Sequence, residues 1–325
     1  MNTLNAADLS RIHVHGRATF LLRVETSSQI EDYTRYDDIR NAIWDFPDDH
    51  LAGCRGLLSE NYFHDGTSLF IGAYAAAPDG GLAASAERMV GFSYGFVGVR
   101  DKSIGFRSLD NLWFYSQYTG VRPEMEGFGL GMALKKFQKD ILLSFYGIQT
   151  VVCTFDPLTA VNAHRNFLRL GMRMLEYRPA VYGEFGGRLN RRDVPSDRFF
   201  MAWDLRSGET PAGGATGEPA GKGSCILSAV RRTIDGRSGP ATIETAGALS
   251  LDGLSDSALV RIPADFNALL RETDVEDPEV RRIPLIWRLR TREAFQTLLG
   301  RGFQVAGFLD VLPGETGPGY LLRRR

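Results

Sequence analysis

A short segment in the middle of the chain constrains the fold most strongly. Residues 112–121 read LWFYSQYTGV, an apolar and aromatic run that predicts a buried strand. After a turn, apolar residues recur at spacings of four, three, four and four: Leu130, Leu134, Phe137, Ile141 and Phe145. This stripe predicts a helix over 130–145 with one face on a sheet, with Lys135, Lys136 and Lys139 on the other side and Gly147 as its stop. The chain therefore contains a strand–turn–helix unit.

Segments on either side of this unit extend it into a mixed fold. Apolar alternation predicts strands at 19–25, 68–75, 89–97 and 150–155, and helical periodicity predicts helices at 28–44 and 160–170. Antiparallel strands come first, and strand–helix–strand–helix follows. This order predicts an α/β (α+β) fold class with a mixed, mostly antiparallel central sheet flanked by helices.

One break in composition divides the chain. Residues 207–223 read SGETPAGGATGEPAGKG, which is small, polar or chain-breaking almost throughout and predicts a flexible linker. We therefore expect a body over 1–206, a linker over 207–224 and a smaller C-terminal α/β unit over 225–325. In that unit, strands are predicted at 258–262, 304–309 and 319–322, and helices at 265–271 and 288–299.

Charge and cysteine content exclude several classes of function. The net charge is −1, so no global attraction to nucleic acid or to a membrane is expected. No apolar run approaches the roughly 20 residues of a membrane span. The three cysteines form no CxxC pair, which favours the reducing cytoplasm and argues against a thiolate metal site. His13 and His15 are expected near a mobile terminus, with no carboxylate placed to complete a metal site.

The turn before the predicted helix has the composition of a phosphate-binding loop. It reads EGFGLG, with glycines at 127, 129 and 131 that allow close backbone approach to a ligand. The free amides and the dipole at a helix N-terminus favour a phosphate. A Walker loop is excluded, because Met132 and Ala133 follow Gly131 instead of Lys and Ser or Thr. A Rossmann fingerprint fits poorly, because Met132 stands at its third glycine.

The same loop resembles the motif of the GNAT acyltransferase family, Arg/Gln-x-x-Gly-x-Gly/Ala, with GVRPE as its lead-in. The resemblance continues through TVVCTFDPL, NAHRNFLRLGM, VYGEF, LNR and PSDRF, so residues 110–204 are similar to a bacterial subgroup described as predicted acetyltransferases. IPADF, WRLRTREAF and GFQVAGF in the C-terminal unit are also similar to that subgroup. The resemblance implies a GNAT fold.

The resemblance further implies that acetyl-CoA, or coenzyme A, is the co-substrate and that no metal is needed. The loop amides would hold the pyrophosphate, the edge of the strand over 112–121 would pair with the pantetheine arm, and Asn162 would hydrogen-bond that arm. The residues implied in cofactor binding are Thr119, Gly120, Val121, Glu126, Gly127, Phe128, Gly129, Leu130, Gly131, Met132 and Asn162.

Two residues depart from the family pattern. Glu126 replaces the usual Arg or Gln and brings a negative charge to a phosphate site, which is compatible with binding where Glu126 points to solvent. Phe167 stands where many members carry the Tyr that protonates the leaving thiolate, and phenylalanine has no proton to give.

The catalytic residues are less clearly marked. Asp156 and Tyr182 are the candidate catalytic residues, although Asp156 equally fits a turn cap in Asp-Pro and Tyr182 fits aromatic packing. Cys153 is expected to be a buried packing residue. Candidate acceptor-binding residues are Tyr115, Gln117, Glu184 and Arg198, with Arg198 also able to pair with Asp197.

Together these features predict an acyl-CoA-dependent N-acyltransferase that acts on the amine of a small, amino-acid-like molecule by direct attack on the thioester. Two alternatives remain open: a non-catalytic acyl-CoA sensor, and an enzyme that uses a bulkier donor such as succinyl-CoA. The C-terminal unit is expected either to cap the acceptor side or to form a homodimer interface.

Overall fold

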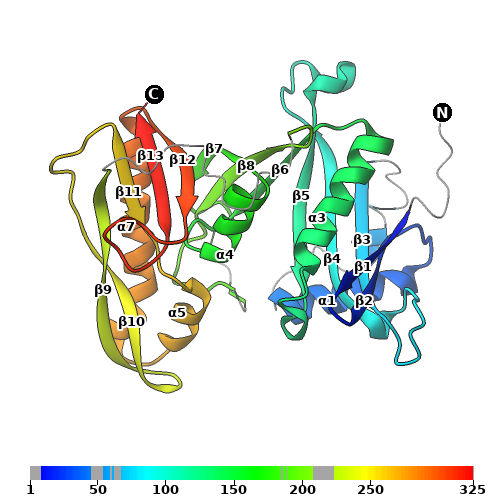
Figure 1. The fold of residues 1–325 in the computed structure, drawn as a ribbon, viewed down its shortest axis with the longest axis horizontal. Coiled ribbons are helices and arrows are strands. Elements are labelled where there is room, and N and C mark those ends of the chain that lie inside the picture. The colour runs from blue at the N-terminus through cyan, green and yellow to red at the C-terminus, as the bar shows by residue number, and fades with distance from the viewer. Residues whose placement is uncertain are drawn as a thin grey trace. The chain divides into compact units, whose positions relative to one another are not determined.

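The computed structural model describes residues 9–44, 54–58, 61, 67–183, 186–187, 189–207 and 223–324. They belong to two compact units, shown in Figure 1. The first unit takes in Met1–Cys153 with Asp204–Arg206, and the second takes in Thr154–Trp203 with Ser207–Arg325. The linker and boundaries predicted at 207–224 stay a prediction, because residues 208–222 lie outside the described residues.

The larger sheet has eight strands in the order β1-β2-β3-β4-β5-β6-β8-β7. Neighbours from β1 to β5 are antiparallel, β5 and β6 are parallel, and β7 and β8 are antiparallel. The predicted mixed, mostly antiparallel class is confirmed. The strands are β1 Ser10–His15, β2 Ala18–Val24, β3 Ser68–Ala75, β4 Met89–Val99, β5 Leu112–Val121, β6 Thr150–Phe155, β7 Arg173–Arg178 and β8 Arg198–Asp204.

In the first unit, α1 (Ile30–Trp44) and α3 (Leu130–Ile141) cover opposite faces of the sheet. Neighbouring residues of β4 show this. The ring of Phe92 contacts Tyr36 of α1, whereas Ser93 accepts a hydrogen bond from Gln138 of α3. Successive strand residues point to opposite faces, so the two helices lie on different sides. The short helix α2 (Cys54–Leu58) packs beside α1.

Helix α3 confirms the strand–turn–helix prediction. Leu130, Leu134, Phe137 and Ile141 are buried against the sheet. A π-helical turn, Leu142–Tyr146, follows the helix, and Gly147 ends it with φ of 66°. The expectation for Lys135 is wrong, because its side chain is only 5% exposed. Its ammonium donates to Ser116 Oγ at 2.5 Å, so a polar group on the sheet compensates for the burial.

The second unit begins within β6 and continues with α4 (Ala160–Ala163) and a π-helical turn, His164–Arg169. It also contains a five-stranded sheet in the order β10-β9-β11-β13-β12. These strands are β9 Ser224–Gly236, β10 Gly239–Leu249, β11 Ser257–Arg261, β12 Phe303–Leu309 and β13 Gly319–Arg324. The helices are α5 Phe266–Glu272, α6 Pro278–Arg281 and α7 Ile283–Gly300, and α7 packs against β9, β10 and β12 (Figure 1).

Aromatic rings fill the interior of both units. In the first unit Tyr33, Tyr36, Phe70, Phe92 and Tyr94 form a buried cluster between α1 and the sheet. In the second unit the buried rings that contact one another are Phe155, Phe167, Phe199, Phe295, Phe308 and Tyr320. Phe295 of α7 contacts Phe199 of β8, so the C-terminal helix shares a core with the strands that follow β6.

Candidate functional site

The loop between β5 and α3 has the backbone conformation that its glycines predict. Gly127 and Gly129 have φ of 89° and 71°, in the left-handed region that glycine adopts without steric cost. Gly129 is the N-cap of α3 and gives the helix no side-chain cap. Glu126 is exposed, which is the orientation that a phosphate at this loop requires.

The amides of this loop are free to bind a ligand. Met132 and Ala133 donate to Gly129 O, whereas none of the N–H groups of residues 127–131 has an acceptor within the described part of the chain. Unpaired N–H groups at the positive end of a helix dipole form a binding site for an anion. The loop can therefore hold a phosphate through backbone groups alone.

A histidine contacts this loop from the first strand. His13 and His15 both belong to β1, which pairs with β2 along its length. His13 Nε2 lies 2.8 Å from Phe128 O, and the rings of His15 and Phe20 pack edge-on against Phe128. Nothing in the sequence indicated this contact, because residues 13 and 128 are far apart along the chain.

Strand β5 leaves its parallel neighbour before it reaches the loop. The recorded β5–β6 pairs are Phe114 with Val151 and Tyr115 with Val152. Next to them, the register with β4 shifts between Tyr94 and Gly95, which makes the exposed Gln117 a bulge. Beyond the bulge, Thr119, Gly120 and Val121 pair with β4 and have no recorded partner on the β6 side among the described residues. An edge of this kind can add an extended ligand as a further strand.

A buried polar cluster lies between this part of β5 and α3. Ser116 Oγ accepts from Lys135 and donates to Gln138 Oε1 at 3.1 Å, and Gln138 donates to Ser93 Oγ at 2.9 Å. Ser93 Oγ in turn lies 3.2 Å from Thr119 Oγ1. These hydrogen bonds fix the side chains on both sides of the bulge, so the cluster stabilises the bulge in β5.

In the second unit, arginines bind Asp156, one of the two candidate catalytic residues. Arg288 of α7 is fully buried and donates to both oxygens of Asp156, and Arg198 Nη1 lies 3.5 Å from Asp156 Oδ2. Burial lowers the pKa of Arg288, but the charge and hydrogen bonds of Asp156 outweigh it and raise that pKa above its ordinary value. Asp156 Oδ1 also caps the turn by accepting from Leu158 N. This geometry favours a structural role for Asp156.

Tyr182 has a different environment. It is 48% exposed, and its hydroxyl lies 2.8 Å from Thr154 Oγ1. The guanidinium of Arg198 lies over its ring, 5.2 Å from the centroid. The structure therefore brings together Asp156, Tyr182 and Arg198. Glu184, the other residue singled out in VYGEF, lies outside the described residues.

The remaining sequence candidates in this unit are Asn162 and Phe167. Asn162 Oδ1 accepts from Arg165 at 2.7 Å. Phe167 is buried against Phe155 and Tyr320. Tyr320 does not replace the phenol that is missing at 167, because it is fully buried and donates to Pro157 O. Burial also raises its pKa well above the ordinary value.

Asp197 forms a second ion pair, and its side-chain partner is Arg292 rather than the neighbouring Arg198. Its fully buried carboxylate accepts two hydrogen bonds from Arg292 of α7, one from Tyr177 and one from the Ala180 amide. Burial raises the pKa of Asp197, but these donors outweigh it, so the pKa lies below its usual value. Arg288 and Arg292 stand four residues apart on one face of α7. Sequence reasoning missed both arginines, although this helical spacing was visible.

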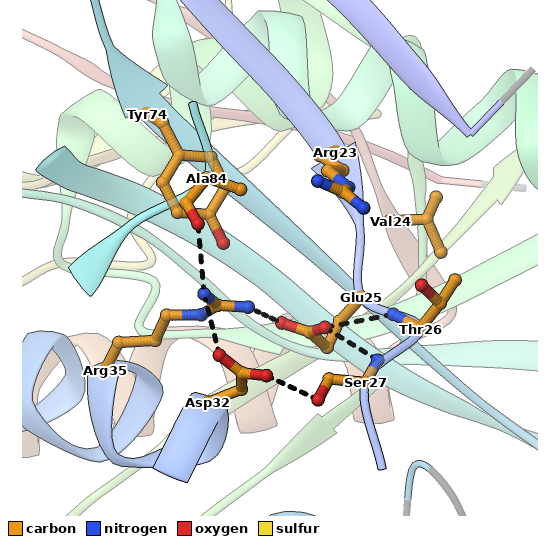
Figure 2. A pocket seen from close by; sticks show the side chains of 9 residues that line it. All are labelled: Arg23, Val24, Glu25, Thr26, Ser27, Asp32, Arg35, Tyr74 and Ala84. Atoms are coloured by element: carbon orange, nitrogen blue, oxygen red, sulfur yellow. Dashed lines mark hydrogen bonds and ion pairs between the residues drawn. The ribbon is translucent and has the colours of Figure 1, made fainter. Parts of the chain in front are cut away.

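A pocket of about 250 Å³ lies in the first unit where β2 leads into α1 (Figure 2). Arg35 there pairs with Glu25 and with Asp32, and Glu25 also accepts from the amides of Thr26 and Ser27. Arg23 also lines the pocket, so two arginines face two carboxylates there. Among the described residues, no three His, Cys, Asp or Glu side chains are grouped as a metal site requires.

Comparisons with known proteins give structural matches only. No family model and no curated protein matches the chain. The ribosomal-protein-S18-alanine N-acetyltransferase from Escherichia coli is 16% identical, with a TM-score of 0.40 over 61% of this chain and 99% of its own. The ribosomal-protein-S5-alanine acetyltransferase from Vibrio fischeri is 12% identical, with a TM-score of 0.42 over 61% and 97%.

PaiA N-acetyltransferase from Thermoplasma acidophilum, solved in complex with coenzyme A, is 13% identical, with a TM-score of 0.38 over 56% of this chain and 98% of its own. All three are acetyltransferases, the class that the sequence resembles. None of the described helices is long and apolar enough to cross a membrane.

Proposed function

We propose that this protein is an acyl-CoA-dependent N-acyltransferase with acetyl-CoA as its ordinary donor. The observation that carries the proposal is the run of unpaired amides at residues 127–131 at the N-terminus of α3. A pyrophosphate bound there would place the pantetheine arm of the cofactor along the open edge of β5, from Thr119 to Val121. Backbone groups and a strand edge suit coenzyme A, whose long arm can hydrogen-bond like a peptide.

The chemistry needs few side chains because a thioester is already activated. The acceptor nitrogen attacks the carbonyl carbon, a carbon–nitrogen bond forms, and the carbon–sulfur bond breaks. The nitrogen gives up a proton and the leaving thiolate takes one. We assign proton donation to Tyr182, which is exposed and keeps its hydroxyl on Thr154 Oγ1. Tyr115, Gln117 and Arg198 remain the proposed acceptor contacts.

A small amine of amino-acid type is the proposed acceptor. Arg198 is mostly buried and lies beside Tyr182, so it can bind a carboxylate next to the reacting amine. Succinyl-CoA remains the alternative donor, since a second carboxylate on the acyl group would also suit an arginine.

An acyl-CoA sensor without turnover is the second candidate. Three observations favour it: Phe167 carries no proton donor, the carboxylate of Asp156 is bound by arginines, and Glu126 puts a negative charge beside the loop. The sensor and the enzyme share the cofactor site, so they differ in turnover and not in affinity.

Two measurements test the proposal. Calorimetry with coenzyme A should show saturable binding, and a thiol-release assay over a panel of amino acids and small amines should show transfer from acetyl-CoA. Binding without release for any amine would favour the sensor. Binding of NAD(P) in place of coenzyme A would contradict both. Glu126→Gln is the matched control: it should bind coenzyme A at least as tightly as the wild type, because it removes a negative charge without touching the amides.

A further inference from the structure

The hydrogen bond between His13 and Phe128 shows which ring nitrogen of His13 carries a proton. A carbonyl oxygen only accepts, so Nε2 of His13 must carry the proton that lies in this 2.8 Å contact. Both the neutral Nε2–H tautomer and the imidazolium satisfy this requirement.

This bond also sets the direction of a neighbouring amide. All described peptide bonds are trans, so the C=O of Phe128 and the N–H of Gly129 point in opposite directions. With the carbonyl held toward β1, the Gly129 N–H points away from β1. That N–H is one of the unpaired donors of the loop.

Without such an anchor, the peptide between Phe128 and Gly129 has little to hold it. A flip of this peptide changes φ of Gly129, and glycine accepts values on both sides of zero at low cost. A flipped peptide would turn its carbonyl oxygen toward the bound anion and withdraw one N–H. The glycines that allow the backbone to approach a phosphate thus also make the loop easy to misorient.

We infer that His13 is a positioning residue for the cofactor phosphates, so that β1 is a working part of the coenzyme A site. This inference rests on the proposed function. His13 itself need not touch the ligand; it holds the Phe128 carbonyl so that the Gly129 amide faces the phosphate. The rings of Phe20 and His15 steady the side chain of Phe128 but do not bond its carbonyl.

Two variants separate the hydrogen bond from ring packing. His13→Phe keeps a ring beside Phe20 and lacks the donor, whereas His13→Gln keeps an N–H donor near the position of Nε2 and lacks the ring. We expect His13→Phe to bind coenzyme A roughly 3- to 10-fold more weakly, which is the effect of one hydrogen bond, and His13→Gln to stay close to the wild type. KM for acetyl-CoA should rise in His13→Phe with kcat nearly unchanged.

His15→Phe is the matched control, because it changes the neighbouring exposed histidine of β1 and leaves the Phe128 carbonyl bonded. Thermal unfolding of each variant checks that it folds, and His13→Gln supplies the test where His13→Phe does not fold. Equal affinity in all variants, or weaker binding by His13→Gln than by His13→Phe, overturns the positioning role. A wild-type protein that binds no coenzyme A contradicts the proposed function, and the role of His13 with it.

Discussion

The polar groups of the glycine loop in the first unit are mostly unpaired, whereas those of the aspartate cluster in the second unit are paired. The aspartate cluster consists of Asp156 and Asp197 with Arg288 and Arg292 of α7. At the loop, the amides of residues 127–131 find no acceptor among the described residues. In the second unit, Asp156 and Asp197 are each bound by an arginine of α7 through two hydrogen bonds. Both regions contain candidate site residues by sequence, yet the loop leaves its amides without an acceptor whereas the two aspartates are fully paired.

This difference separates binding from stability. A polar group that is paired within the protein mainly contributes to the fold, since freeing it for a ligand would leave a buried charge behind. An unpaired donor at the surface costs little and can bind whatever reaches it. We therefore expect substitutions in the aspartate cluster to change the free energy of unfolding, and substitutions in the loop to change ligand affinity.

The largest expected effect is on stability. Asp156→Ala should lower the free energy of unfolding by about 4 kcal/mol, because it removes the carboxylate that hydrogen-bonds the fully buried guanidinium of Arg288. Urea unfolding measures the change. The exposed pair of Arg290 and Glu293 gives the control, and Glu293→Ala should cost less than about 1 kcal/mol.

The double variant Asp156→Asn with Arg288→Met sharpens this result. It removes the charges of Asp156 and Arg288 together and should recover at least half of the lost stability, since the fully buried Arg288 charge is no longer present. An Asp156→Ala protein as stable as the wild type would show that the carboxylate is not the structural anchor described above and would return it to the list of candidate bases.

The next effect is on affinity. Gly129→Asp should weaken coenzyme A binding about 100-fold or more, because it adds a negative charge to the phosphate-binding loop and its Cβ would lie 3.7 Å from His13 Nε2, the donor to the Phe128 carbonyl. The left-handed φ of Gly129 adds a stability cost of about 1–2 kcal/mol. Gly147→Asp is the control, since Gly147 has a similar φ of 66° at the other end of α3. Unchanged affinity in Gly129→Asp, measured by calorimetry, would place the phosphates elsewhere.

The next prediction concerns the hydroxyl of Tyr182, whose removal should affect turnover but not binding or folding. Tyr182→Phe should lower kcat for acyl transfer about 100-fold and leave coenzyme A affinity unchanged, because it removes only a proton donor. Thr154→Val, which keeps the phenol but removes its hydrogen-bond partner, should lower kcat much less. A Tyr182→Phe enzyme with wild-type kcat would assign the proton to water.

The smallest effect is a dependence of stability on pH. The pKa of Asp197 is lower in the folded protein than in the unfolded chain, so its stabilisation is complete above the unfolded pKa of about 4 and is lost as pH falls through the folded value. Urea unfolding between neutral and acid pH should show a steeper acid loss for the wild type than for Asp197→Asn. An equal loss of unfolding free energy at acid pH in both proteins would mean that a group other than Asp197 causes it.

Local patterns in the sequence predicted much of the first unit. The bounds of β3, β5 and β6 agree with the prediction, as does the start of α3, because each has a clear apolar period between turn residues. The strands β1, β8, β9 and β10 were not predicted. The long hairpin of β9 and β10 is rich in exposed polar residues, so its strands are defined by pairing with each other rather than by burial.

By itself the sequence determined the glycine loop, the helix behind it and the mixed fold class, since these follow from the spacing of residues close along the chain. The tertiary structure decided which polar groups are left unpaired. Lys135 is predicted on the side of α3 away from the sheet but is buried and donates to Ser116 of β5. His13 bonds the loop from a segment near the N-terminus, and Asp156 meets an arginine 132 residues further along the chain. Contacts between distant segments depend on the folded path of the whole chain, which no local period encodes.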